Sequence, residues 1–216
     1  MKKYKKVNYP YDKDKVLAEI FSQSSNFVNI FSRRETFKNR PFSIVPDEMY
    51  EKVDAIEANG KLVPGAISSW KGFNFTHIPG DLSSNIGQNK DRLIKENWEW
   101  KPDVQCQYLK KIVQDLGFVS IQNIRAMVMQ PGGFGPVHSD IVLKNDYYQK
   151  HTSVTLNIED GGQPLTALID GKMYELNDSC FVFEDDCWHG VGIVSSRRTQ
   201  LRINGVVDYN IFNTYL

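Results

Sequence analysis

The chain has 216 residues, with 26 basic and 26 acidic side chains, so its formal net charge at neutral pH is zero. This length suits a single domain, residues 1–216, with a sizeable core. The balanced charge creates no field that would attract nucleic acid or an anionic membrane. No apolar run approaches the roughly 20 residues of a membrane span, and no signal-peptide core follows the start. Composition therefore predicts a cytoplasmic protein that acts on neither nucleic acid nor membranes.

The three cysteines, Cys106, Cys180 and Cys187, form no CxxC pair, and their odd number argues against a disulfide framework. Reduced thiols are the expected state. Cys187 lies two residues before His189, where a soft donor could compete for a metal ion. An ordinary buried thiol is the favoured interpretation, because no second cysteine lies close enough in the sequence to pair with it.

The first half of the chain carries helical patterns. Apolar residues recur at helical spacing in residues 12–23 and 47–58, which predicts two amphipathic helices. A third helix is expected to begin near Asp103, directly after a proline, and to end at Gly117. We expect these helices to buttress a sheet, so that residues 1–117 form a helical and strand-containing support.

After Gly117 the pattern changes from helical to alternating. Asp170-Gly171 is a strong two-residue hairpin turn between two of the expected strands. Many short antiparallel strands predict a mainly β fold, a closed barrel or jelly roll. The expected strands are 118–130, 153–158, 165–176 with the turn inside, 180–183, 190–194 and 199–207.

Two of these strands have one wholly polar face. Alternate side chains point to opposite sides of a strand, and the polar positions are His151, Ser153, Thr155 and Asn157 in one strand and Arg198, Gln200, Arg202 and Asn204 in the other. An ordinary sandwich also has a polar face, turned to solvent. The second polar face includes Arg198, a candidate anion-binding arginine. This favours a polar pocket inside a barrel over a solvent-facing sheet.

The candidate metal ligands are His138 and Asp140, in an HxD motif, and His189 further along. Two imidazoles and one carboxylate bind ferrous iron on one face and leave the opposite face open for a cosubstrate and dioxygen. A single histidine is more often a hydrogen-bonded structural group, and HxD alone is a weak pattern. The order of the motifs makes a metal site the better interpretation. A Pro-Gly-rich turn precedes His138, and Arg198 follows His189 as a counter-charge for an acidic cosubstrate.

These residues resemble the Fe(II)- and 2-oxoglutarate-dependent dioxygenases with a double-stranded β-helix fold, which is cupin-like. The run RAMVMQPGG from Arg125, leading into HSD, is similar to aspartyl/asparaginyl β-hydroxylase-like members. The run TLN from Thr155 with the following Gly-Gly is similar to prolyl 4-hydroxylases. The run from Phe183 to Val191 resembles the approach to the distal histidine in both. The resemblance covers residues 118–207, the expected metal-binding jelly-roll core.

The resemblance implies Fe(II) held by His138, Asp140 and His189, with 2-oxoglutarate and dioxygen as cosubstrates. Arg198, nine residues after His189, would bind the far carboxylate of 2-oxoglutarate. Thr155 and Gln200 are the further cosubstrate candidates, although relatives often carry a tyrosine and a serine at those positions. Arg197 and Arg202 are rivals for Arg198. Related halogenases lack the carboxylate ligand, so Asp140 favours hydroxylation.

A small molecule or a peptide is the expected substrate, and by resemblance an amino acid or an amino-acid side chain. Arg125 and Met127 share a strand face leading toward the metal motif and are candidate substrate contacts. Aromatic residues between Trp70 and Trp100 could line a substrate groove, but such density is more typical of a core. Two alternatives remain: a cupin-like metalloenzyme without 2-oxoglutarate, and a non-catalytic ligand-binding barrel.

Overall fold

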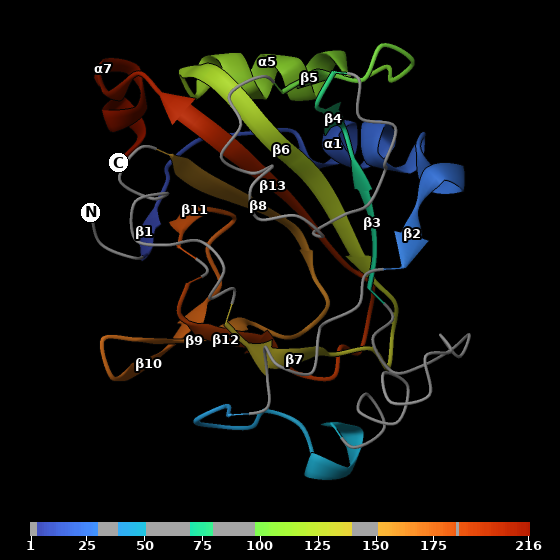
Figure 1. Cartoon of the computed structure of the whole chain (residues 1–216), viewed down its shortest axis with the longest axis vertical. Helices are drawn as coiled ribbons and strands as arrows, with labels where there is room; N and C mark the ends of the chain where they lie inside the picture. Colours follow the sequence, from blue (N-terminus) through green and yellow to red (C-terminus); the bar gives the residue numbers. More distant parts are fainter. Residues whose placement is uncertain (1–3, 30–38, 51–69, 80–97, 140–150, 185) are drawn as a thin grey trace.

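The computed structural model describes residues 4–29, 39–50, 70–79, 98–139, 151–184 and 186–216. Within these ranges the chain forms two facing antiparallel sheets, and helices cover the far side of the larger sheet (Figure 1). This is the mainly β jelly roll that the strand pattern predicted, with the double-stranded β-helix fold that the family resemblance implied. Within the described ranges, the two longer helices that pack against the larger sheet precede residues 118–207 in the sequence, as expected for a buttress.

The major sheet runs in the order β1-β11-β8-β13-β6-β3-β2, with every neighbouring pair antiparallel. Three of its strands come from the first half of the chain, where the sequence pattern had located helices but no individual strand. They extend the sheet at both edges, so the front of the chain belongs to the same sheet as the predicted core. The strands are β1 (Tyr4–Lys6), β11 (Cys180–Phe183), β8 (Thr152–Asp160), β13 (Arg198–Val207), β6 (Phe118–Met129), β3 (Trp70–Asn74) and β2 (Val28–Asn29).

The minor sheet has the order β10-β9-β12-β7, with strands β10 (Lys172–Leu176), β9 (Leu165–Ile169), β12 (Trp188–Val191) and β7 (Gly135–His138). Asp170 and Gly171 both have positive φ, 50° and 76°, which confirms the predicted hairpin turn. The expected strand at 190–194 was misplaced, because Val194 instead exchanges backbone hydrogen bonds with the turn at residues 132–133. A small separate sheet joins β4 (Thr76–His77) to β5 (Glu99–Trp100).

Two helices pack on the outer face of the major sheet, α1 (Lys13–Phe21) and α5 (Gln107–Asp115). The first matches the predicted helix at 12–23. The second begins later than the expected Asp103, because Val104 closes a turn onto Lys101 before the helix starts. Of the helix predicted at 47–58, residues 47–50 are helical and the others lie outside the described residues. Short helical turns follow at Ser24–Asn26, α7 (Tyr209–Phe212) and Asn213–Tyr215.

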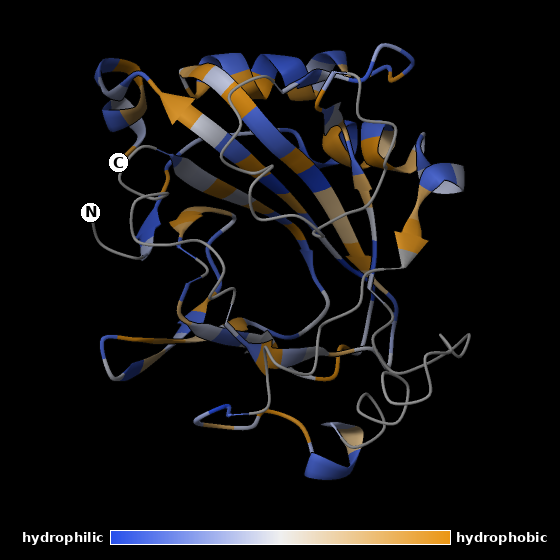
Figure 2. Ribbon diagram, in the orientation of Figure 1, coloured by the Kyte–Doolittle hydropathy of each residue, from blue (hydrophilic) through white to orange (hydrophobic). Residues whose placement is uncertain are grey.

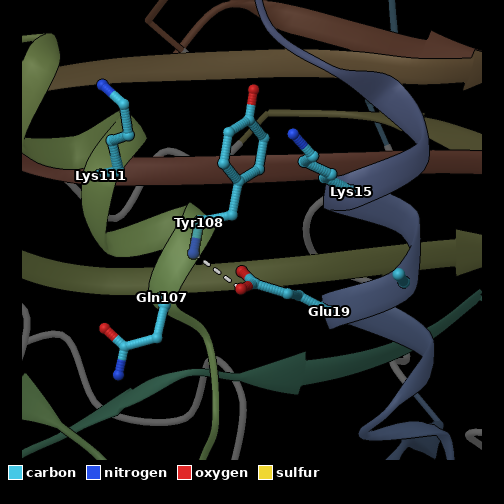
Figure 3. Close-up of a pocket in the computed structure, with 6 residues that line it drawn as sticks. Lys15, Glu19, Gln107, Tyr108 and Lys111 are labelled. Carbon is cyan, nitrogen blue, oxygen red and sulfur yellow. Dashed lines mark hydrogen bonds between the residues drawn. The ribbon is translucent and has the colours of Figure 1, made fainter.

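The start of α5 is capped by the neighbouring helix. Cys106 at the N-cap position makes no side-chain hydrogen bond to the helix. Instead the Glu19 carboxylate of α1 accepts the backbone N–H of Tyr108 at 2.7 Å (Figure 3) and that of Leu109 at 2.8 Å. These bonds satisfy two of the N–H groups that a helix start leaves without partners. The shallow depression between the helices, which includes Lys15 and Lys111, lies on the opposite side of the major sheet from β7 and β12.

The two faces of the major sheet differ in chemistry. Hydrophilic and hydrophobic bands alternate along β6 and β13 (Figure 2). The hydrophobic set, which includes Ile124, Leu156 and Leu201, forms one core with α1 and α5. The other face is turned to the minor sheet. A second apolar cluster lies between the sheets and includes Phe181, Phe183 and side chains of β9 and β12. None of the helices in the described ranges combines the length and apolarity that crossing a membrane needs.

Candidate metal and cosubstrate site

His138 and His189 lie side by side in the minor sheet. His138 ends β7, His189 is the second residue of β12, and the two are paired in the antiparallel register. Their ring centroids are 4.4 Å apart. Gly190 makes this close strand pairing possible, because a Cβ there would lie 2.9 Å from the Gly135 carbonyl oxygen. Residues 51 positions apart in the sequence are thus brought together as neighbouring imidazoles.

Each imidazole is oriented by a carbonyl two residues earlier in its own strand. The Nδ1 atom of His138 lies 2.7 Å from the Pro136 oxygen, and that of His189 lies 2.9 Å from the Cys187 oxygen. A carbonyl oxygen only accepts, so Nδ1 carries a proton in both rings, and in the neutral tautomer this leaves the lone pair on Nε2. Metal-binding histidines are typically fixed in this way, with the other ring nitrogen donating to a carbonyl.

The donor chemistry fits a divalent transition metal, since two neutral imidazoles suit iron among others. Asp140, the predicted third ligand, lies outside the described residues. Across the described stretches, no group of three His, Cys, Asp or Glu side chains gathers as metal ligands would. Cys187 is buried and its thiol donates to the Glu184 carbonyl at 3.4 Å, a contact that suits the ordinary buried thiol expected from the sequence.

Two contacts that the sequence did not suggest support the histidine pair. The Ser139 hydroxyl donates to the Asp186 carbonyl at 2.8 Å and thereby ties the end of β7 to the loop before β12. On the outer side of the minor sheet, the Tyr50 hydroxyl accepts the N–H of Val137, next to His138, at 3.1 Å. Tyr50 itself packs on Phe134 in a small apolar cluster. No sequence pattern could show these contacts, because their partners are far apart in the chain.

Arg198 is fully buried at the start of β13. Its Nη1 donates to the carbonyls of Asp160, at 2.6 Å, and Gln163. Gly161, with φ +68°, allows this turn to close on Arg198, since a Cβ there would meet the arginine's Cβ at 2.9 Å. Nε and Nη2 have no partner within the described part of the chain. These two nitrogens share one edge of the guanidinium, the edge that binds a carboxylate bidentately.

Burial lowers the pKa of Arg198 to about 10, with the Asp160 carboxylate opposing the shift. The lowered value is still well above neutral pH, so the guanidinium stays charged there. A buried charge is unfavourable unless it is paired. The arrangement therefore suits a site for an anion.

The rival arginine at position 197 points the other way, as alternation required. Arg197 donates from Nε and Nη2 to the two oxygens of Glu159, at 2.8 and 2.7 Å, and its guanidinium carbon lies 4.4 Å from the Phe21 ring centroid of α1. It belongs to the outer face and has no access to the space between the sheets. Arg202, by contrast, shares the inner face with Arg198.

The remaining predicted site residues all lie on the inner face of the major sheet. Thr155 is buried, and its hydroxyl has no partner among the described residues. Gln200 is buried beside Asn157, with a long 3.5 Å contact between their amides. Arg125 and Met127 of β6 are partly buried, and their neighbours Ile124 and Ala126 face the helices instead. The polar faces predicted for two strands therefore meet inside the jelly roll.

The aromatic residues of the first half divide between two roles. Phe73 and Phe75 lie in the core beneath the helices, which confirms the core interpretation for them. Trp70 packs at the edge of the cluster between the sheets. Phe183, which the sequence showed only as part of a motif, has a central place, since its ring centroid lies 5.2 Å from that of His189 in an edge-on contact.

Comparison with known proteins places the fold. No family model and no curated protein matches the chain. A solved structure of a Trichoplax adhaerens prolyl hydroxylase, in complex with a hypoxia inducible factor peptide fragment, is similar with a TM-score of 0.53 at 13% identity, over 100% of this chain and 88% of that one. A Burkholderia pseudomallei protein of the 2OG-Fe(II) oxygenase family matches at 14% identity over 93% and 95% of the two chains, with a TM-score of 0.43.

A Pseudomonas putida prolyl-4-hydroxylase matches at 22% identity over 47% of this chain and 62% of that one, with a TM-score of 0.34. At these identities the likeness is one of fold. The fold predicted from the resemblance to Fe(II)- and 2-oxoglutarate-dependent dioxygenases, in its prolyl hydroxylase-like form, is thereby confirmed.

Proposed function

We propose that this chain is a non-haem iron oxygenase that couples the oxidative decarboxylation of 2-oxoglutarate to hydroxylation of an amino acid or an amino-acid side chain. The observation that carries the proposal is the pair of carbonyl-oriented imidazoles, His138 and His189, in the same interior that holds Arg198. A metal site alone would not require a buried guanidinium with one edge that has no partner among the described residues.

His138 and His189, through Nε2, and Asp140 would hold Fe(II), an ion that such a set binds while keeping other positions open. Bound there, iron supplies the dioxygen chemistry: 2-oxoglutarate loses carbon dioxide and becomes succinate with one oxygen atom, and a substrate C–H becomes C–OH with the other. The protein's own residues bind and orient the reactants. The carbonyls of Pro136 and Cys187 fix the ring orientation and the tautomer in which Nε2 can bind a metal.

Arg198 would hold the far carboxylate of 2-oxoglutarate through its Nε and Nη2 edge. Because Nη1 is fixed by the Asp160 and Gln163 carbonyls, the guanidinium is already oriented before the anion arrives. A preoriented donor loses little side-chain freedom on binding. The Thr155 hydroxyl and the Gln200 amide, both buried on this face, are the proposed additional contacts.

The direct test is anaerobic addition of Fe(II) and 2-oxoglutarate to the purified protein. We expect a weak visible charge-transfer band, absent in His138→Ala, and succinate formation once air is admitted. Succinate that forms only with an added amino acid or peptide would point to the substrate. No band together with no succinate under air would overturn the proposed oxygenase function.

The arginine is tested separately by measuring 2-oxoglutarate binding with redox-silent Mn(II). Arg198→Gln should weaken binding by about 30-fold or more, since truncating one partner of a buried charge pair costs about 2 kcal/mol at least. Arg197→Gln, on the outer face, is the matched control and should leave the affinity unchanged. Metal-dependent oxidation that persists without 2-oxoglutarate, and survives Arg198→Ala, would favour the cupin-like metalloenzyme instead. Absence of any metal binding would favour a ligand-binding barrel.

A further inference from the structure

Segment 39–50, from the first half of the chain, lies against the side of the minor sheet that faces away from the major sheet (Figure 1). Tyr50, at the end of this segment, is only 3% exposed. The Tyr50 hydroxyl accepts the backbone N–H of Val137 at 3.1 Å. Val137 directly precedes His138 in β7. Tyr50 therefore contacts the backbone of β7 one residue before a candidate metal ligand.

A second contact of the same segment lies beside the other histidine. A Cβ placed on Gly190 would lie 3.0 Å from the Ile44 Cδ1 atom, so the missing side chain of Gly190 leaves room for Ile44. Successive side chains of a strand point to opposite sides, which places this room on the face of β12 opposite to the His189 ring. Ile44 thus packs behind His189, while Tyr50 is bonded beside His138.

Support of this kind matters for β7 because it is an edge strand. Among the described strands of the minor sheet, β7 pairs with β12 alone. The register of that pair shifts between His189 and Val191, so the ladder is irregular next to the histidines. An N–H on the open edge of a sheet has no neighbouring strand to accept it. The Tyr50 hydroxyl supplies one hydrogen bond that a further strand would otherwise make.

Tyr50 is held in place by its own surroundings. The Arg40 guanidinium carbon lies 3.6 Å from the Tyr50 ring centroid, and Arg40 Nη2 donates to Asp47 at 2.5 Å. The ring of Phe134, in the turn before β7, contacts the Tyr50 ring edge-on, with 6.1 Å between centroids. These rings belong to an apolar cluster separate from the two larger ones, made of Val45, Tyr50 and Phe134 with Ile44 and Met49 packed against it. The hydroxyl therefore has a fixed position from which to hold β7.

We infer that Tyr50 is a positioning residue of the metal site, and that segment 39–50 sets the placement of the two histidines from behind. This inference rests on the proposed function, in which His138 and His189 hold Fe(II). Without the Tyr50 hydroxyl, β7 would be aligned for only part of the time, and metal affinity falls in proportion to the aligned fraction. One hydrogen bond of this kind changes an equilibrium by about fivefold, which sets the expected loss of affinity.

The first test compares two tyrosine-to-phenylalanine variants. Tyr50→Phe keeps the ring and removes the acceptor for Val137. Tyr9→Phe, the matched control, removes a buried hydroxyl that donates to Asp115 in the core beneath the helices. Mn(II) binding, measured by calorimetry well below the melting temperature of each variant, should weaken about fivefold in Tyr50→Phe and stay unchanged in Tyr9→Phe. Unchanged affinity in Tyr50→Phe, or an equal loss in both variants, would overturn the inference.

Ile44→Val tests the second contact and decides alone if Tyr50→Phe does not fold. The change removes the Cδ1 methyl that packs against Gly190 and keeps the rest of the side chain. Mn(II) affinity should fall about twofold, less than for the hydrogen bond, because only a few dispersion contacts are lost. Ile20→Val in α1 removes an equivalent buried methyl from the main core and should leave the affinity unchanged. Equal affinities in the two valine variants contradict a support behind His189.

Amide hydrogen exchange on metal-free protein separates this inference from the proposed function. The Val137 N–H should exchange about fivefold faster in Tyr50→Phe and at an unchanged rate in Tyr9→Phe. If the unaltered protein binds neither Mn(II) nor 2-oxoglutarate but exchange responds in this way, the oxygenase proposal fails and the positioning of β7 by Tyr50 stands. If Mn(II) binds and succinate forms, yet Tyr50→Phe alters neither affinity nor exchange, the positioning role fails and the oxygenase proposal stands.

Discussion

The two faces of the major sheet are both buried, yet they carry opposite kinds of side chain. Leu201 and Ile203 of β13 face α1 and α5 and have no exposed surface. Gln200 and Arg202, the residues interleaved with them, face the minor sheet and are also almost fully buried. Burial on the outer face is driven by removal of apolar surface from water. Burial on the inner face removes polar groups from water, which opposes folding unless they find partners.

This contrast assigns stability and function to different faces of one sheet. The outer face and its helices supply the apolar core on which the sheet rests. The inner face holds the charged and hydrogen-bonding groups that reactants would need. Polar groups held in a fixed frame are what a preorganised binding site requires. Substitutions on the two faces should therefore have opposite consequences for stability and for binding.

The largest difference should come from adjacent residues of β13. Leu201→Ala leaves a cavity under the helices and should lower the free energy of unfolding by about 2–5 kcal/mol. Gln200→Ala should lower it by less than about 1 kcal/mol, since its amide contact to Asn157 is long and neutral. Urea unfolding of both variants measures the two changes. Equal losses would contradict the division between the faces.

A smaller effect on the outer side concerns the cap of α5. Glu19→Ala removes the acceptor of two helix N–H groups and should cost about 1–2 kcal/mol of unfolding free energy. Glu19→Gln keeps one acceptor oxygen and should cost less. Chemical denaturation gives both values, and 2-oxoglutarate affinity should change in neither variant. A loss of binding would show that the two faces are coupled.

Two threonines on opposite faces offer a matched pair. Thr155→Val replaces an inner hydroxyl that has no described partner, so the free energy of unfolding should stay the same or rise by about 1 kcal/mol, while 2-oxoglutarate binds several-fold more weakly. Thr199→Val removes an outer hydroxyl that donates to Glu159 at 2.5 Å. That change should lower stability by about 1 kcal/mol and leave binding unaltered. Thermal melts and calorimetry check both, and the reverse pattern would refute the assignment.

The smallest effect concerns the outer ion pair and depends on pH. Hydrogen bonds from Arg197 and Thr199 hold the pKa of Glu159 below its ordinary 4.5. A carboxyl group with a lowered folded-state pKa stabilises the protein above its unfolded pKa and loses that effect as pH falls through the lowered value. Glu159→Gln should therefore cost less than about 1 kcal/mol at pH 7, because the pair is partly exposed. The difference from the unaltered chain should shrink below pH 4.5 and should not grow.

Local pattern was enough to predict most of the jelly-roll strands. Alternation in 198–207 and 153–158 is a property of the strand itself, so the polar and apolar faces could be read from sequence. The Asp170-Gly171 turn needs positive φ at both positions, which those residues tolerate. The strand containing His189 was placed two residues too late, because its limits depend on pairing with β7 and β9 rather than on its own composition.

The site was only partly predictable for the same reason. The motif order pointed to His138, His189 and Arg198, and their types suggested the chemistry. The sequence could not show that Phe183 contacts both Arg202 and His189, or that Tyr50 holds the backbone beside His138, since these contacts join distant segments. Likewise, the sequence could not show which of Arg197, Arg198 and Arg202 would bind the cosubstrate. That choice depends on what packs against each face of the major sheet.

By itself the sequence determined the repeating geometry: which residues alternate, where the chain turns, and which groups could bind iron or an anion. These properties follow from φ, ψ and side-chain chemistry within a few residues. Only the tertiary structure decided which polar face turns inward, which arginine is buried, and which strands of the first half join the sheet. Those outcomes depend on long-range pairing and on the helices that occupy the outer face, so no local pattern contains them.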